Sequence, residues 1–163
     1  VLFTAPILLC KSFAPEMENL EDASIVNITS LATLYPLPYM PLYNSCKSGL
    51  SSFTQSMMLE YKTLKWIDFR LGDIRTSFNN SAPKQSEESQ SDSMKCAWTQ
   101  IEKQLNESPL PQVAAKQILR SLKKCKDGTI YGGGFFQARL APFFESLITS
   151  QMVSKILKFR YGL

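Results

Sequence analysis

The stretch VNITSLATLYPLPYMPLYNSCKSGL, residues 26–50, decides how this chain folds. The run SIVNIT at residues 24–29 is rich in β-branched residues and predicts a buried strand. Residues 31–40 carry two prolines and predict a loop, after which apolar residues recur near helical spacing from residue 41 to about 61. The run WIDFRL at residues 66–71 predicts a second strand. Strand, loop, helix and strand in this order predict a right-handed βαβ unit in a parallel sheet.

The other segments of the 163-residue chain extend this α/β pattern. We expect a buried helix at residues 1–13, a helix at 111–124 and a last strand at 129–131, because each is an apolar or amphipathic run. Residues 79–94 are rich in Ser, Gln and Glu and predict a mobile excursion. We therefore expect an α/β domain over residues 1–131, with a mobile lid at about 79–96, and an apolar, basic-ended extension over 132–163.

Composition excludes several classes of function. The formal charge of +4 is mild and the basic residues are scattered, which argues against a nucleic-acid partner. The chain has no histidine, and its four cysteines have no CxxC spacing. Ser-His-Asp chemistry, Cys-His chemistry and most zinc sites are thereby removed, so we expect no metal site. Scattered cysteines indicate a reducing, cytosol-facing location.

Ser30, Tyr43 and Lys47 form the candidate catalytic set. A strand end and an adjacent helix can bring Ser30 to Tyr43, and i,i+4 spacing places Tyr43 and Lys47 on one helical face. Moving a phenol from a pKa near 10 to neutral pH requires about 4 kcal/mol, of which a nearby ammonium supplies part. Ser30 would hydrogen-bond a substrate oxygen on which charge develops. Tyr61 and Lys65 share the same spacing, but Ser48 and Tyr61 lie in one predicted helix, about 20 Å apart.

These motifs together resemble the catalytic part of a short-chain dehydrogenase/reductase. That family pairs a strand ending in Asn-Ile-Ser-Ser with Tyr-x-x-x-Lys, and this chain has Asn27-Ile28-Thr29-Ser30 before Tyr43-Asn44-Ser45-Cys46-Lys47. After the next strand the family carries Pro-Gly-x-x-x-Thr; this chain has Leu71-Gly72-Asp73-Ile74-Arg75-Thr76, without the proline. The resemblance implies that Tyr43 transfers the proton, that Ser30 positions the carbonyl oxygen and that Lys47 lowers the Tyr43 pKa.

The resemblance also implies a dinucleotide cofactor. Tyr43 and Lys47 would contact its ribose end, and Gly72, Ile74 and Thr76 would line its carboxamide side. The Gly-rich strand-turn-helix that binds the cofactor phosphates in this family does not occur in the sequence. We therefore expect the C-terminal half of a doubly wound Rossmann fold with a parallel sheet, its N-terminal nucleotide-binding βαβ unit missing. NADPH is the expected cofactor, with NADH still open because the selector residues are absent.

The substrate and the partners follow less directly. The Tyr-rich loop and the tail from residue 129 are similar in arrangement to fungal NADPH-dependent 1-acyl-dihydroxyacetone-phosphate reductases, which implies a lipid precursor as substrate and an endoplasmic reticulum or lipid-droplet surface. Ile148, Met152, Ile156 and Phe159 form a stripe near three basic residues, which suits peripheral membrane binding or a cover for the substrate pocket. A steroid, retinol or simple ketone substrate remains open. So does an inactive remnant that binds or dimerises through the helix at 42–61.

Overall fold

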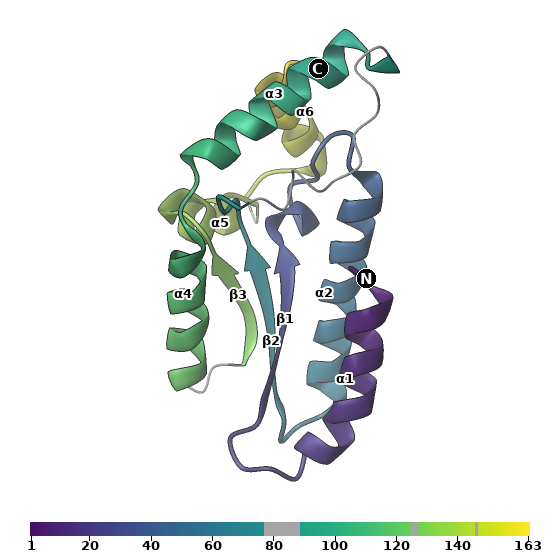
Figure 1. The fold of residues 1–163 in the computed structure, drawn as a ribbon, viewed down its shortest axis with the longest axis vertical. Helices are drawn as coiled ribbons and strands as arrows, with labels where there is room; N and C mark the ends of the chain where they lie inside the picture. The colour runs from purple at the N-terminus through teal and green to yellow at the C-terminus, as the bar shows by residue number, and fades with distance from the viewer. Residues whose placement is uncertain (77–88, 125–126, 146) are drawn as a thin grey trace.

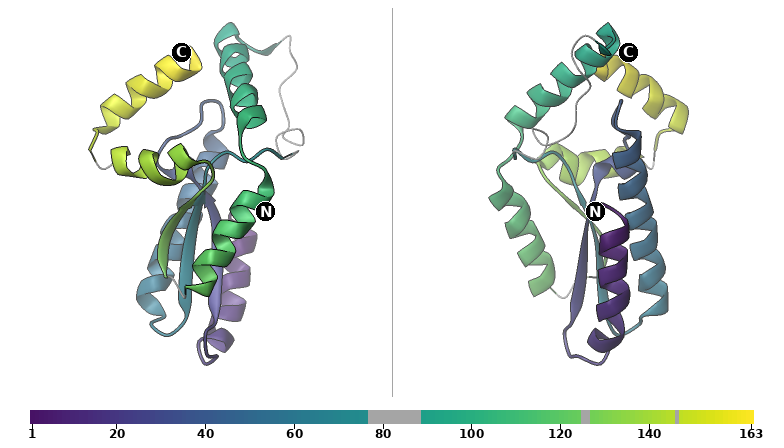
Figure 2. Two further views of the ribbon diagram at one scale, coloured as in Figure 1. Left: turned by 90° about the vertical axis from the view of Figure 1, so that its left-hand side faces the viewer. Right: turned by 45° about the vertical axis from the view of Figure 1, so that its right-hand side comes forward.

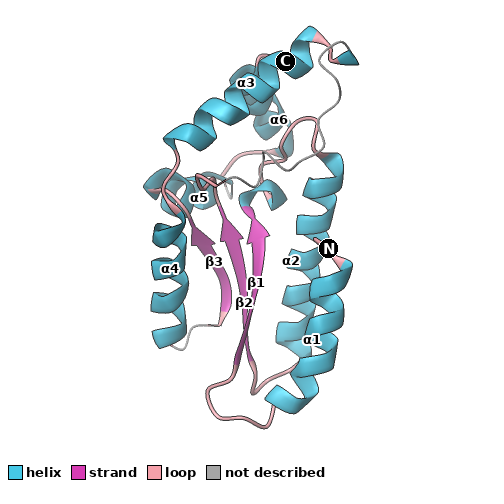
Figure 3. Cartoon of the chain, in the orientation of Figure 1, coloured by secondary structure: helices cyan, strands magenta, loops and turns pink. Residues whose placement is uncertain are grey.

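The computed structural model describes residues 1–76, 89–124, 127–145 and 147–163, and its centre is a three-stranded parallel sheet. The strands are β1 (Ser24–Ser30), β2 (Lys65–Leu71) and β3 (Gly128–Gly132), and they stand in that order (Figures 1 and 3). Ser24 lies opposite Lys65, and Ile67 opposite Gly128. The predicted α/β class with parallel strands is confirmed, and all three strands point their carboxyl ends to the same edge.

Helices cover both faces of this sheet. Helices α1 (Thr4–Met17) and α2 (Pro41–Glu60) lie on one face and α4 (Pro111–Lys123) on the other, as the right-hand view of Figure 2 shows. Side chains alternate across β2, so Trp66 faces α1 and α2 while Phe69 faces the opposite side. Trp66 is fully buried in a cluster with Cys10, Ala14, Met57 and Leu64. This packing holds the amino ends of β1 and β2 against α1 and α2.

Helix α1 differs from the expected buried helix at residues 1–13. It continues to Met17, with Pro15 inside its last turn, because Ala14 packs fully into the core. Only the side with Cys10 and Ala14 is buried, whereas Leu8, Leu9 and Phe13 are each more than half exposed. The apolar run is therefore a helix with one buried face.

Helices α3 (Asp92–Glu107) and α6 (Ser150–Tyr161) form a layer above the carboxyl ends of the strands (Figure 1). Most of the expected lid, at 79–88, lies outside the described residues, and its residues 92–96 form the start of α3. Ser91 caps this helix by accepting from the Met94 N–H. Ala97 and Ile101 pack against Tyr161 of α6.

The tail is a folded cover with three helical segments. It contains η4 (Phe136–Leu140), α5 (Ala141–Glu145) and α6, which begins at a Thr149 cap and ends at Gly162. Gly162 has φ +68°, and a Cβ there would lie 2.6 Å from the Cys96 Sγ, so both backbone conformation and space require glycine. The Tyr35 hydroxyl, in the loop after β1, donates to the Ala141 carbonyl at 2.6 Å. The tail thereby joins the loop that leads into α2.

Candidate active site

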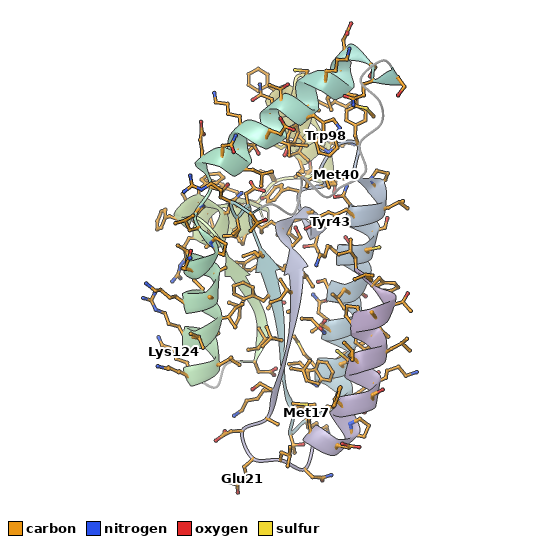
Figure 4. The ribbon with its side chains drawn as sticks, viewed as in Figure 1. Met17, Glu21, Met40, Tyr43, Trp98 and Lys124 are labelled. Atoms are coloured by element: carbon orange, nitrogen blue, oxygen red, sulfur yellow. The ribbon has the colours of Figure 1, made fainter. Side chains whose placement is uncertain are left out.

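A cavity of about 490 Å³ lies at the carboxyl ends of the strands, beneath the tail. Its lining is mainly apolar and comes from β1, the following loop, α2, the segment after β2, α3, η4, α5 and α6. The six residues predicted for catalysis and cofactor contact all border it: Ser30, Tyr43, Lys47, Gly72, Ile74 and Thr76. Figure 4 shows Tyr43 and Met40 at the same end of the molecule as Trp98, with Met17, Glu21 and Lys124 toward the opposite end.

Ser30 is held in place by the turn that follows β1. It is the last residue of the strand and the N-cap of the short helix η1 (Leu31–Thr33), where its hydroxyl accepts from the Ala32 N–H at 3.1 Å. The Thr33 hydroxyl donates to the Ser30 carbonyl at 2.8 Å. Ser30 is 8% exposed, so its side chain is fixed but still reaches the cavity.

Tyr43 lies in the first turn of α2, where Pro41 begins the helix. Asn44 orients this turn, because its side chain donates to the Leu37 carbonyl at 2.8 Å and accepts from the Leu37 N–H at 3.2 Å. These two bonds fasten the Pro-rich loop to the helix. The Tyr43 phenol is hydrogen-bonded to Ser30, so the strand end and the helix converge as the sequence predicted.

The electrostatics of Tyr43 differ from the expectation. Burial raises the pKa of the Tyr43 phenol, the hydrogen bond with Ser30 opposes this rise, and the negative charge of Asp73 adds to it. The Lys47 ammonium lies 6.0 Å from the centre of the Tyr43 ring and donates to the Ile28 carbonyl at 2.7 Å. Burial lowers the pKa of Lys47. The net shift of the Tyr43 pKa is upward, because desolvation outweighs the hydrogen bond with Ser30, which favours the phenolate.

The second Tyr-x-x-x-Lys match has a structural role. Tyr61 follows the end of α2 and packs on Trp66, with ring centres 6.0 Å apart. Lys65 begins β2 and pairs with Asp22 at 2.8 Å. Neither residue borders the 490 Å³ cavity. Only the match at Tyr43 and Lys47 meets the strand end, as predicted from its context.

Gln137 of η4 is a cavity residue that the sequence did not indicate. Its side-chain oxygen accepts from the Asp73 N–H at 3.0 Å, and its amide nitrogen donates to the Asp73 carboxylate at 2.6 Å. A Cβ at Gly72 would lie 2.5 Å from the Gln137 Oε1, so the missing side chain of Gly72 lets Gln137 approach the backbone. These contacts join residues 64 apart and leave no local sequence signal.

A buried polar network lies beneath the cavity. Asp68 of β2 has no exposed surface; it accepts from the Thr29 hydroxyl, from the Ser51 hydroxyl at 2.7 Å and from the Arg70 Nε at 2.9 Å. Asp68 and Arg70 lie two residues apart and therefore share one face of β2. Thr29 and Ser51 complete the network, and the Arg70 guanidinium also lies over the Tyr131 ring. The network ties the strand end that carries Ser30 to the helix that carries Tyr43 and Lys47.

The sequence matches the family described as short chain dehydrogenase over residues 1–87, which is more than half of the chain. The chain belongs to the short-chain dehydrogenase/reductase family. Human dehydrogenase/reductase SDR family member 4 is 30% identical over 95 residues, which cover 56% of this chain and 34% of that protein. The 3-ketodihydrosphingosine reductase of Bacteroides thetaiotaomicron is 26% identical over 81 residues, which cover 48% of this chain and 30% of that protein.

Solved structures show the same fold. A short-chain dehydrogenase/reductase from Burkholderia phymatum, solved in complex with NAD, is 18% identical with a TM-score of 0.67, and the match covers 89% of this chain and 53% of that chain. The chain thus spans about a third of the length of the curated relatives it matches and about half of this structure. The solved structures show a partial Rossmann-like fold, and the family match places the chain in an oxidoreductase family whose homologues bind NAD(P).

Proposed function

We propose that this chain carries the proton-transfer site of a short-chain reductase that reduces the carbonyl of an apolar, lipid-like substrate with NADPH. One observation supports this most strongly: Ser30, Tyr43 and Lys47 border one largely apolar cavity, with Tyr43 hydrogen-bonded to Ser30. The raised pKa of Tyr43 favours the reductive direction, because a phenol that keeps its proton at neutral pH acts as an acid toward a carbonyl oxygen.

The residues present fit the nicotinamide end of the cofactor. Gly72, Ile74 and Thr76 border the same cavity as Tyr43 and Lys47, and the absent side chain of Gly72 leaves the backbone approachable once Gln137 moves. Lys47 already donates to a backbone carbonyl and has further donors for a ribose hydroxyl. When bound, the nicotinamide supplies the hydride that reaches the carbonyl carbon.

The chain's own residues supply the proton. Ser30 would donate a hydrogen bond to the carbonyl oxygen, where negative charge develops, and would hold it beside Tyr43. Tyr43 then gives its phenolic proton to that oxygen and is left as a phenolate, which Lys47 stabilises across the helix turn until solvent returns a proton. Because the Ser30 hydroxyl accepts from the Ala32 N–H and the Asn44 side chain of the Tyr43 turn donates to the Leu37 carbonyl, little reorganisation is needed at the moment of transfer.

The test is NADPH consumption with a 1-acyl-dihydroxyacetone phosphate, a 3-ketosphinganine, a steroid, retinal and a simple ketone. It is carried out on this chain and on the longest open reading frame that carries it. Tyr43→Phe should lower kcat by about 100-fold or more. Tyr61→Phe is the matched control and should leave kcat unchanged, since Tyr61 packs on Trp66 away from the cavity. Full activity in Tyr43→Phe would refute the proposal.

The substrate panel separates the finer alternatives. The apolar lining supports a lipid, as does the relative named 3-ketodihydrosphingosine reductase, and an acyl-dihydroxyacetone phosphate at an endoplasmic reticulum or lipid-droplet surface is the specific candidate. Turnover of the simple ketone alone would remove the lipid part of the proposal and leave the reductase part intact.

A non-catalytic dimerising module is the second candidate. It is favoured by Leu42 and Leu59 on α2, which are 82% and 81% exposed. A dimer that Leu42→Ser with Leu59→Ser dissociates, together with no NADPH turnover in any length of the protein, would favour this alternative.

A further inference from the structure

Helix α6 has two apolar faces. On its inner face Leu157 and Tyr161 pack against the cluster around Ala97 and Ile101 of α3. The outer stripe consists of Met152, Ile156 and Phe159, which are 50%, 52% and 91% exposed. A surface helix ordinarily has one apolar stripe and a polar opposite face. The outer stripe packs against no cluster in the part of the chain that the structure describes, and it therefore indicates a second partner.

The exposed apolar surface continues onto η4 and α5. Phe136, Phe143, Phe144 and Leu147 are 54%, 61%, 46% and 65% exposed, and the rings of Phe143 and Phe144 meet with centres 5.9 Å apart. The left-hand view of Figure 2 shows α5 and α6 as neighbouring segments at the same end of the molecule. We call the exposed apolar side chains of η4, α5, residue 147 and the outer stripe of α6 the apolar face.

Three of these side chains also border the cavity. Phe136, Phe144 and Ile156 line the space that holds Tyr43, and each is about half exposed. A side chain that both lines a cavity and meets solvent lies at its opening. The apolar face thus lies at one entrance to the candidate active site. A surface patch unconnected with the site would share no side chains with the cavity lining.

The charges beside the apolar face have one dominant sign. Residues 135–163 contain four basic residues, Arg139, Lys155, Lys158 and Arg160, against the single acidic residue Glu145. All four basic side chains are exposed. On α6, Lys155 and Arg160 flank the outer stripe on its two sides. Apolar side chains flanked by exposed cations match the boundary between acyl chains and anionic headgroups.

We propose that η4, α5 and α6 dock on the surface of an anionic lipid bilayer and that the cavity receives its substrate directly from that bilayer. The docking part rests on exposure and charge, and the delivery part rests on the proposed function. Among the described helices, none combines the length and apolar character needed to span a bilayer. A substrate with an acyl chain would then reach Tyr43 past Phe136 and Ile156 without exposing the chain to water.

The test is co-sedimentation of the full 163-residue chain with vesicles of phosphatidylcholine, with and without phosphatidylserine. We expect binding to the mixed vesicles that weakens with salt. Met152→Ser with Phe159→Ser should lower the partition coefficient by about tenfold or more. Lys155→Glu with Lys158→Glu should remove the preference for phosphatidylserine. Neither pair includes a residue that lines the 490 Å³ cavity.

The matched control is Leu42→Ser with Leu59→Ser on α2, where exposure is as high but the apolar face is not involved. It should bind vesicles like the unchanged protein, and so should Tyr43→Phe, which separates docking from catalysis. Equal vesicle binding by the Met152 and Phe159 variant would overturn the proposal. So would a dimer, seen by light scattering, that only this variant dissociates, because the apolar face would then be covered by a second copy of the chain.

Discussion

The floor of the cavity and its cover differ in how they place their side chains: the floor buries a charged group among hydrogen-bond partners, whereas the cover exposes apolar side chains. In the floor, formed by β1, β2 and α2, Asp68 is fully buried and binds three partners from three elements. In the cover, formed by η4, α5 and α6, Phe159 is 91% exposed, and the tail is joined to the rest by contacts such as Tyr35 to Ala141 and Gln137 to Asp73. Proton transfer needs fixed atoms, whereas substrate entry needs a surface that can open.

The largest difference in stability between floor and cover should come from replacing one phenylalanine by alanine in each region. Phe69→Ala empties a fully buried site on β2 and should destabilise the chain by about 4 kcal/mol. Phe159→Ala removes a side chain that is 91% exposed and should change stability by less than about 0.5 kcal/mol. Urea unfolding followed by circular dichroism measures both. Equal losses would mean that the cover is as firmly packed as the floor.

The buried ion pair gives the next largest effect. Asp68→Asn leaves the Arg70 guanidinium, whose side chain is only 11% exposed, without its carboxylate and should cost about 3 kcal/mol. Asp22→Asn is the control, since Asp22 is 80% exposed and its pair with Lys65 is worth less than about 1 kcal/mol. The same unfolding experiment applies. A loss below 1 kcal/mol for Asp68→Asn would show that the network does not stabilise the floor.

Gly72 of the floor and Gln137 of the cover are in contact, so the effects of their substitutions on stability should be coupled. Gly72→Ala places a Cβ 2.5 Å from the Gln137 Oε1, so Gln137 must move and its contacts with Asp73 are disturbed, at about 1.5 kcal/mol. In a Gln137→Gly background the same change should cost much less, because the Oε1, Cδ and Cβ atoms of Gln137, which lie 2.5, 2.8 and 2.9 Å from the added Cβ, are all absent. A double-mutant cycle in urea measures this coupling. Additive losses would contradict the contact.

The smallest effect concerns pH. Because burial raises the pKa of Tyr43, the folded state holds this proton more tightly than the unfolded state. The stability that this proton contributes is complete below pH 10 and is lost as the pH rises from about 10 through the folded pKa. Tyr43→Phe should remove part of that loss, while Tyr161, whose pKa burial also raises, stays in both proteins.

Difference absorbance of phenolate, wild type minus Tyr43→Phe, gives the titration directly. A difference curve centred above pH 10 agrees with the burial of Tyr43, and one centred below pH 10 would mean that Lys47 outweighs desolvation in solution.

Most of the floor was predictable because its signals are local. The β-branched run before Ser30, the prolines before α2 and the i,i+4 spacing of Tyr43 and Lys47 each lie within a few residues. The predicted bounds of β1, α2, β2, α4 and β3 agree with the structure to within a residue or two. Local context also distinguishes the Tyr-x-x-x-Lys match at Tyr43 and Lys47 from the one at Tyr61 and Lys65.

The cover was less predictable. Helix α3 was not expected, although Ser91 is a typical N-cap and Ala97, Ile101 and Leu105 have helical spacing. Polar neighbours diluted this pattern, and the partner of its apolar side, Tyr161, lies far along the chain. The tail was expected as an apolar, basic-ended extension with a stripe of Ile148, Met152, Ile156 and Phe159, but its division into η4, α5 and α6 was not predicted.

The sequence by itself determined the order of strand, loop, helix and strand, and the spacing that brings Ser30 to Tyr43, because hydrophobic periodicity and turn residues act over short distances. Only the tertiary structure decided that Gln137 lies on Gly72, that Thr29 and Ser51 bind Asp68, and that the tail lines the cavity. Those contacts join elements far apart in the chain, and they depend on packing geometry that leaves no local pattern.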